Sequence, residues 1–236
     1  MRTARRISNL VADQEYDWLA TNVNVGVAVV AGQGGAVAKR RNRADVLRVA
    51  FELLEEGGLG MVTLNGIARR LGAHLNSVSF QVKTKRRLLD LMAAEVLGHL
   101  SLDDLPTDPI ERIEALLERY RTVLLAHRDG ARLVAGTEAV ERNTLRVADA
   151  SITALLEAGA DPLRAVRTFW SLHFFLLGLV QEEQERSPIT SDSFARRVDD
   201  QEYPALATVG RQLIDDPFDE RFAHGLRSLL SSIAEQ

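Results

Sequence analysis

The sequence predicts an all-α fold. Apolar residues make up 46% of the 236 residues and aromatic residues only 6%, and Leu, Ala, Glu and Arg, which favour helices, are abundant. From residue 43 onward, apolar side chains recur three and four residues apart, which is the spacing of one helix face. Glycine and proline stand where these stretches begin and end, as they do at helix termini.

The first helical stretches are predicted to form a helix-turn-helix. Thr63 is a good N-cap for a short helix, and Gly72 permits the tight turn that follows it. Helix, turn, short helix, turn and short helix is the order of a three-helix helix-turn-helix domain. The predicted helices are 43–57, 64–71, 75–81 and a longer connecting helix over 85–100.

The rest of the chain is predicted to be a larger helical domain over residues 101–236. Prolines and aspartates near residues 103–109 form a linker, and His127–Gly130 interrupts the next helical pattern. We therefore divide the chain into residues 1–38, 39–100 and 101–236. The helices predicted in the last part are 110–126, 143–158, 162–186, 203–214 and 217–232.

Residues 1–38 differ from the rest, and we expect an extension without fixed structure. Alternating valines over 23–29 resemble a strand, and the glycines of 32–35 follow it. A strand before a glycine-rich turn also suggests nucleotide binding. The third glycine of that fingerprint is replaced by Val37, however, and no helical pattern follows directly.

Charge is distributed unevenly along the chain. Residues 39–90 carry 11 Lys and Arg against 5 Asp and Glu, whereas residues 91–236 carry 15 against 25. A basic module beside an acidic body suggests that one end meets a polyanion; a solvated charged surface is the alternative.

Several classes of protein are disfavoured by the sequence. The absence of cysteine excludes disulfides and Cys-based zinc sites and fits the cytoplasm. No run reaches the roughly 18 uncharged apolar residues of a membrane span. The five histidines lack metal-binding spacing, and no Gly-x-Ser-x-Gly motif occurs. We therefore predict neither an enzyme, a metal site nor a membrane partner.

The second short helix is predicted to read DNA. Such a recognition helix enters the major groove, and its Asn, Gln and Ser side chains can pair with base edges. Cations directly after it are placed to bind phosphates. Ordinary bundle helices are the alternative. The candidate DNA contacts are Thr63, Asn65, Leu75, Asn76, Ser77, Ser79, Phe80, Gln81, Lys83, Lys85 and Arg86.

Two patterns in this region resemble a known family. They are Thr63-Leu64-x-x-Ile67-Ala68-x-x-Leu71-Gly72 and Phe80-x-Val82-x-x-Lys85-x-x-Leu88-Leu89. They closely resemble the DNA-binding domain of the TetR (tetracycline-repressor-like) family. The motifs His127–Arg132, Gly136-Thr137 and Gln181–Glu185 resemble the ligand-binding domain of tetracycline repressors, so the resemblance covers about residues 42–236.

The resemblance implies a homodimer with an effector pocket. Helices 162–186 and 217–232 are then expected to pair with their copies as a four-helix interface. The pocket is expected among helices 110–126, 143–158 and 162–186, and a ligand there is expected to shift helix 85–100. The implied pocket residues are Leu116, Tyr120, Val134, Trp170, His173 and Phe174.

Five positions depart from the family pattern. In the recognition helix, Ser79 and Gln81 replace the usual Tyr and His, so the operator sequence cannot be carried over. In the ligand domain, Val134 replaces a metal-binding His, Glu138 an Arg and Leu116 a drug-contacting Asn. These changes remove a metal ligand and a polar anchor, so we expect a more apolar effector and no metal or other cofactor.

The sequence therefore predicts a homodimeric repressor that binds a palindromic operator and is released by a small, largely apolar effector. Two alternatives remain. One is a DNA-binding regulator without an effector, which a collapsed core around Tyr120 and Trp170 would favour. The other is a nucleotide-binding protein that uses the turn at Gly32–Gly35.

Overall fold

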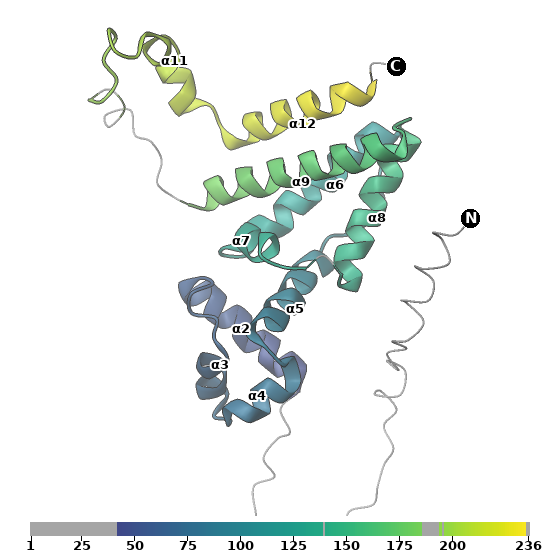
Figure 1. Ribbon diagram of the computed structural model, residues 1–236, viewed down its shortest axis with the longest axis vertical. Coiled ribbons are helices and arrows are strands. Elements are labelled where there is room, and N and C mark those ends of the chain that lie inside the picture. The colour runs from purple at the N-terminus through teal and green to yellow at the C-terminus, as the bar shows by residue number, and fades with distance from the viewer. Residues whose placement is uncertain (1–41, 139, 186–193, 195, 235–236) are drawn as a thin grey trace, which may run out of the picture. The chain divides into compact units, whose positions relative to one another are not determined.

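A computed structural model describes residues 42–138, 140–185, 194 and 196–234, and within these residues the chain is helical and contains no strand (Figure 1). The predicted N-terminal extension, the alternating valines and the glycine-rich turn lie outside the described residues. The helices are α2 (Arg43–Gly57), α3 (Leu64–Leu71), α4 (Leu75–Val82), α5 (Lys85–Gly98), α6 (Pro109–Leu125), α7 (Gly130–Ala135), α8 (Arg142–Glu157), α9 (Pro162–Gln184), α11 (Pro204–Asp215) and α12 (Phe218–Ala234).

The predicted all-α fold is confirmed, with helix ends within about two residues of those expected from the sequence. One helix was not predicted. The segment around His127–Gly130 was interpreted as a break, whereas the short helix α7 begins at its last residue. Asp129 turns the chain there in the left-handed conformation, with φ of 54° and ψ of 22°. A helix of six residues is too short to produce a clear periodic pattern.

Helix starts are fixed by side chains that the sequence displays. Asn42 and Asp45 form a reciprocal capping box at α2, with N···O distances of 3.0 and 3.1 Å. Asp108 caps α6, and Asp161 caps α9. In both of these helices a proline follows the cap, where its missing N–H leaves no hydrogen bond unmade.

Helix α5 connects the helix-turn-helix to the larger set of helices. It packs against α2 and α4 on one side and against α6, α7 and α8 on the other. Leu88, Met92 and Leu97 on this helix are buried in one hydrophobic core that extends from α2 to α12. Because close-packed interiors transmit strain, a displacement of α5 would move both the helix-turn-helix and the larger set of helices. The expected boundary between residues 100 and 101 stays a prediction.

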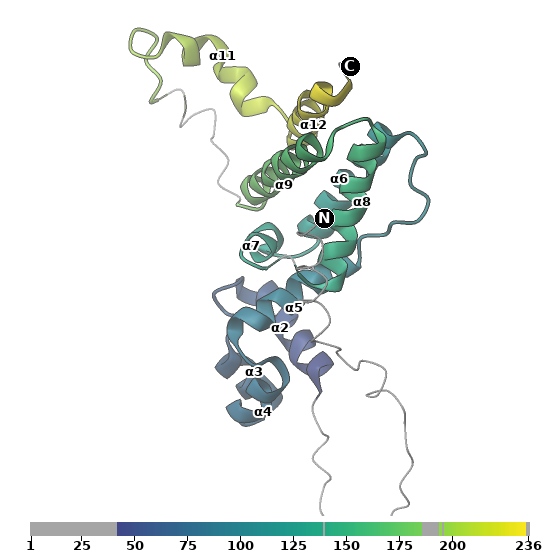
Figure 2. The same ribbon diagram turned by 45° about the vertical axis from the view of Figure 1, so that its right-hand side comes forward.

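Helix α9 is the central helix of the larger part. It packs against α6, α7, α8 and α12, and it runs alongside α12 in both views (Figures 1 and 2). Among the described residues it is also the single helix long and apolar enough to cross a membrane, and 33% of its most apolar window is buried. Core helices of globular proteins meet the same criterion, and the four packing partners of α9 identify it as one.

Candidate nucleic-acid interface and effector site

The helix-turn-helix is formed by α3, the turn at Gly72 and α4. Thr63 caps α3 by accepting a hydrogen bond from the backbone N–H of Gly66 at 3.0 Å. Gly72 has φ of 57° and ψ of 43°, the left-handed conformation that glycine adopts without steric cost. Ile67, Ala68 and Leu71 are buried, so α3 packs inward and holds α4 in place.

Helix α4 presents a mixed polar and apolar face to solvent. Val78 and Val82 are buried and anchor the helix. Leu75, Asn76 and Ser77 are exposed, which places the N-terminal turn of α4 where base edges would be met.

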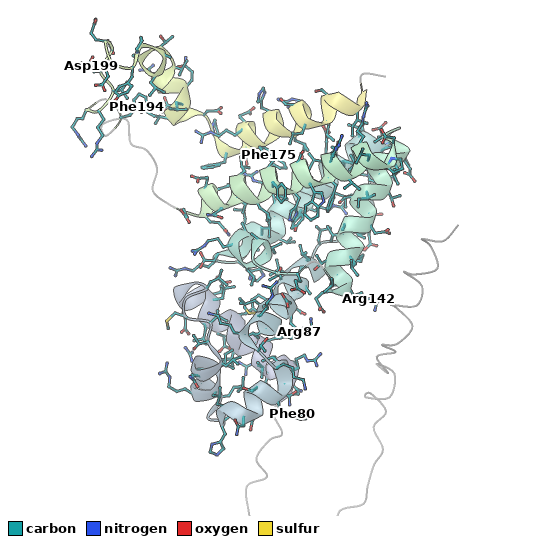
Figure 3. The ribbon with its side chains drawn as sticks, viewed as in Figure 1. Phe80, Arg87, Arg142, Phe175, Phe194 and Asp199 are labelled. Carbon is teal, nitrogen blue, oxygen red and sulfur yellow. The ribbon has the colours of Figure 1, made fainter. Side chains whose placement is uncertain are left out.

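Phe80 is 74% exposed and points away from the neighbouring helices (Figure 3). Six of the candidate DNA contacts lie on α4, and two of these, Ser79 and Gln81, are half-buried. They flank Val78 and Val82, so part of each side chain is covered by the core that those valines enter.

Exposed cations surround the end of α4 and the start of α5. Lys83 places its Nζ 5.9 Å from the centre of the Phe80 ring, within range of a cation–π contact. Thr84 caps α5 by accepting from the N–H of Arg87 at 3.1 Å, and Lys85 is exposed at the first helical position. Together with exposed Thr63 and Asn65 at the start of α3, these groups and the exposed residues of α4 form what we call the recognition strip. It consists of the start of α3, the exposed face of α4 and the start of α5.

Arg86 is already engaged by an acidic side chain. Its Nη2 lies 2.9 Å from Oε1 of Glu138, although each side chain keeps 61% of its surface exposed. The neighbouring Arg87 pairs with Glu141. The sequence predicts a phosphate contact for Arg86 but does not reveal Glu138 as its partner, because no local pattern joins residues 52 positions apart.

The six predicted effector residues do not all lie in one enclosed space. Leu116, Tyr120 and Val134 are buried, and His173 is half-buried with its ring centroid 6.2 Å from that of Tyr120. In contrast, Trp170 and Phe174 are 43% and 64% exposed on α9, where they stack on each other with centroids 5.4 Å apart. In a single chain these two rings therefore form a surface rather than the wall of a pocket.

Burial keeps the two polar groups of this cluster neutral. It raises the pKa of the Tyr120 hydroxyl well above its ordinary value of 10, and it lowers the pKa of His173 below 6.5. Neither side chain forms a hydrogen bond to any residue that the structure describes. The surroundings favour an uncharged ligand with an apolar body and a polar group that can reach them.

No group of three or more His, Asp or Glu side chains suited to a metal ion occurs within the described ranges. Acidic side chains near the site serve other partners instead. Arg121 on α6 binds Glu183 of α9 through two N–H groups at 2.8 and 3.1 Å and Asp219 of α12 at 2.6 Å. Its guanidinium also lies 5.3 Å from the centre of the Phe222 ring. This network joins α6, α9 and α12, and no local sequence pattern indicates it.

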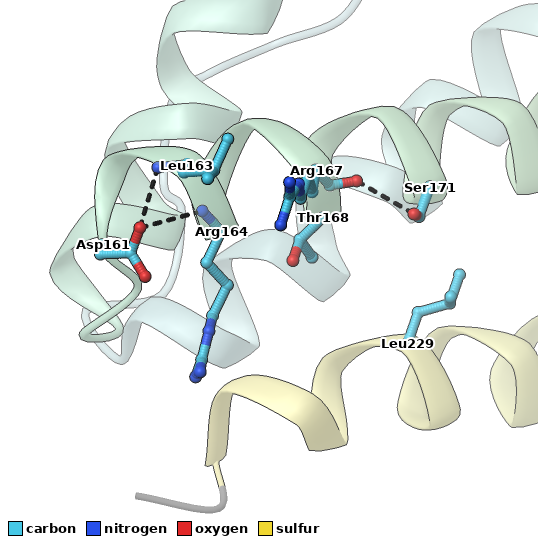
Figure 4. Close-up of a pocket in the computed structure, with 7 residues that line it drawn as sticks. All are labelled: Asp161, Leu163, Arg164, Arg167, Thr168, Ser171 and Leu229. Atoms are coloured by element: carbon cyan, nitrogen blue, oxygen red, sulfur yellow. Dashed lines mark hydrogen bonds between the residues drawn. The ribbon is translucent and has the colours of Figure 1, made fainter.

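A separate cavity of about 440 Å³ lies between the start of α9 and α12 (Figure 4). Asp161 caps α9 there, and the N–H groups of Arg164 and Leu163 hold the pKa of its carboxyl below 3.8. Arg167 also lines the cavity. The charged lining does not suit an apolar effector, so the cavity differs from the predicted pocket.

Comparison with known proteins agrees with this architecture. A family model described as "Tetracyclin repressor-like, C-terminal domain" matches residues 104–236. The chain is 31% identical to the class D tetracycline repressor protein of Escherichia coli over 202 residues, which cover 84% of this chain and 91% of that protein.

Two solved structures show the same fold over most of their length. One, from Streptomyces coelicolor A3(2), is described as a possible TetR family transcriptional regulator. It is 32% identical, has a TM-score of 0.73 and matches 82% of this chain and 98% of that chain. The other, a TetR variant from Acinetobacter baumannii in complex with minocycline, is 28% identical with a TM-score of 0.63, covering 82% and 97%. The chain belongs to the TetR family of transcriptional regulators, and its C-terminal domain is of the tetracycline-repressor type.

Proposed function

We propose that the chain is a homodimeric transcriptional repressor that binds a palindromic operator and is released by a small, largely apolar effector. The observation that carries the proposal is the recognition strip. Asn76, Ser77 and Phe80 are exposed on α4, and Lys83 and Lys85 are exposed beside them. A helix with this exposure can enter a major groove while the adjacent cations bind phosphates on either side.

An exposed apolar face on α9 supports a dimer. Leu163, Val166, Trp170 and Phe174 lie three or four residues apart and are 42–64% exposed. The rest of α9 is packed against α6, α7, α8 and α12. A second copy of the chain is the occupant we propose for this face, because a contiguous apolar surface on a helix pair is typical of subunit interfaces. One short helix contacts too few base pairs to be specific, and two copies supply two recognition helices for two half-sites.

The effector is proposed to bind near Leu116, Tyr120, Val134 and His173. The buried members are apolar or neutral, which favours a ligand without charge. By the family resemblance, Val134 stands at a metal-binding position, so a magnesium chelate would lack a ligand there. Trp170 and Phe174 would be covered by the second copy and would then border the same region.

A gel-shift assay tests the proposal. The full-length chain is mixed with duplex DNA from the flank of its own gene, and the assay is repeated with a panel of hydrophobic compounds. Without added metal, we expect the chain to retard the flanking duplex, and we expect one or more compounds to abolish that retardation. A duplex of shuffled sequence is the control. If the flanking duplex is retarded no more than this control, specific DNA binding at this locus is contradicted.

Tyr120→Ala separates the effector site from the DNA site. We expect the variant to bind DNA like the wild type but to require more of an active compound for release, because the truncation removes apolar surface and the hydroxyl from the proposed pocket. Normal release in the variant would contradict the proposed pocket. Tyr120 also lies in the continuous core, so the second candidate function is a DNA-binding regulator without an effector. If no compound in the panel releases the DNA, that second function is favoured.

A further inference from the structure

The start of α5 carries three cations that are opposed by two carboxylates of the same chain. Lys85, Arg86 and Arg87 occupy its first three positions. Arg86 pairs with Glu138 at 2.9 Å, and Arg87 pairs with Glu141. Two of the three charges available to DNA phosphates are therefore neutralised within the protein.

The carboxylates come from the segment between α7 and α8, and this segment and the first turns of α8 are hydrogen-bonded to α5 and to the residues just after it. The backbone N–H of Glu138 donates to Oδ1 of Asp90 at 3.2 Å. Asn143 donates to the carbonyl of Ala94 at 2.9 Å, and Arg146 donates to the carbonyl of Leu100 at 2.7 Å. The carboxylates are thus held beside α5 by contacts that do not depend on the ion pairs.

The same segment follows directly on the proposed effector site. Val134 is buried at the end of α7, and Thr137 donates its hydroxyl hydrogen to the Val134 carbonyl at 2.8 Å. Glu138 is the next residue. A change in the position of α7 would therefore change the position of the Glu138 carboxylate.

We infer that Glu138 is an intramolecular competitor of the DNA backbone for Arg86. A carboxylate and a phosphate oxygen accept the same charge-assisted hydrogen bonds from a guanidinium. While Glu138 holds Nη2 of Arg86, that donor is occupied and the carboxylate offsets the positive charge that a phosphate would meet. The pair is exposed, and exposed pairs are worth only about 0–1 kcal/mol. DNA can consequently displace Glu138, but with a lower affinity than an unopposed Arg86 would give. The inference rests on the proposed function, and it assigns a regulatory role to a position within the DNA site.

Displacement also leaves a carboxylate close to the DNA. Salt screens charges over about 10 Å at 0.1 M ionic strength, and a side chain within hydrogen-bond reach of Arg86 lies inside that distance of any phosphate Arg86 contacts. Glu138 therefore opposes binding both before and after it releases Arg86. Its effect is electrostatic and independent of base sequence.

The test uses the full-length chain and two duplexes, one from the flank of its own gene and one of shuffled sequence. Affinity is measured by fluorescence anisotropy at salt concentrations from about 50 to about 200 mM. Glu138→Gln keeps the shape and the backbone bond to Asp90 but removes the charge. Glu118→Gln, an exposed position on α6, is the matched control for net charge.

We expect Glu138→Gln to bind both duplexes about two- to fivefold more tightly than the Glu118→Gln control. The plot of log affinity against log salt should steepen by up to about 0.9, because one more phosphate is neutralised without an internal competitor. In an Arg86→Gln background the gain should shrink to the part that comes from repulsion between the carboxylate and the DNA, since the carboxylate then has no Arg86 to compete for.

Two results would overturn the inference. One is that Glu138→Gln and Glu118→Gln are indistinguishable in affinity and salt slope. The other is that the gain persists in full when Arg86 is replaced. If the wild-type chain binds neither duplex at any salt concentration, the proposed function fails first and the inference with it. If the wild-type chain binds DNA but Glu138→Gln changes neither affinity nor salt slope, the inference is contradicted while the proposed function stands.

Discussion

The backbone N–H of Leu59 donates a hydrogen bond to Oδ2 of Asp129 at 2.8 Å, across 70 positions of sequence. Leu59 lies in the loop between α2 and α3, and Asp129 precedes α7. The same turn is linked to α2 by His127, whose Nδ1 lies 3.1 Å from Oε1 of Glu55. The turn before α7 thus holds the helix-turn-helix directly, in addition to the connection through α5.

Asp129→Ala should weaken this link. Loss of the acceptor leaves the Leu59 N–H without its partner in a half-buried setting, which costs about 1–3 kcal/mol of unfolding free energy. Asp129→Asn should be milder, because Asn keeps an acceptor oxygen and tolerates the left-handed conformation. Thermal unfolding followed by circular dichroism measures both. Identical melting of Asp129→Ala and the wild type would show that the bond adds nothing to stability.

Gly72→Ala should destabilise the turn of the helix-turn-helix. An L-residue in the left-handed conformation costs about 1–2 kcal/mol, and Gly72 holds φ at 57°. Gly60→Ala is the matched control, since a Cβ at that position meets no atom within 4 Å. Urea denaturation should show a lower midpoint for Gly72→Ala than for Gly60→Ala, and equal midpoints would contradict the assigned role of the turn.

Asn76→Ala and Lys85→Ala should weaken DNA binding in different ways. Asn76 is exposed on the proposed base-reading face, so its loss should cost about 1–3 kcal/mol on the preferred duplex and little on shuffled DNA. Lys85 is exposed and is proposed to bind phosphate, so its loss should weaken binding to both duplexes and reduce the salt slope by about 1. Competition binding with both duplexes measures the difference. Equal losses on both duplexes for Asn76→Ala would refute the assigned face.

Phe174→Glu should disrupt the dimer and leave the helical fold intact. Phe174 is 64% exposed in one chain, so a charge there is tolerated until a second copy covers it. Burying an unpaired carboxylate should raise the dimer dissociation constant about 100-fold or more. Leu145→Glu on α8, where the side chain is 51% exposed, is the control. Analytical ultracentrifugation of the two variants decides, and a dimer of unchanged strength would place the interface elsewhere.

Acid should destabilise the chain partly through His173. Burial lowers the pKa of its imidazole below the ordinary value of 6.5. As the pH falls, the unfolded chain then binds a proton more readily than the folded chain, so stability is lost below about pH 6.5 and is fully present above it. His173→Phe should show a weaker decline in urea midpoint between about pH 8 and about pH 5. The same decline in both proteins would mean that His173 does not contribute.

Local signals made most of the fold predictable. Thr63, Gly72 and the prolines at the first positions of α6 and α9 act on their own neighbours, so the sequence indicates them directly. Leu116 and Tyr120 also followed from the helical spacing of 110–126, whereas Val134 followed from the family resemblance alone, because α7 was not predicted.

Contacts between distant segments could not be predicted. Arg86 meets Glu138, and Arg121 meets Glu183, only after helices have packed, and one sequence contains no pattern that joins them. The exposure of Trp170 and Phe174 was also missed, because an apolar helix face has the same periodicity whether it meets its own core or another subunit.

The most direct test of the central claim is the stoichiometry and sequence preference of the DNA complex. Sedimentation of the full-length chain with duplex from the flank of its own gene, titrated against shuffled duplex, reports both at once. We predict two chains on each flanking duplex and tighter binding there than on the shuffled sequence. A single chain that treats the two duplexes alike would contradict the account.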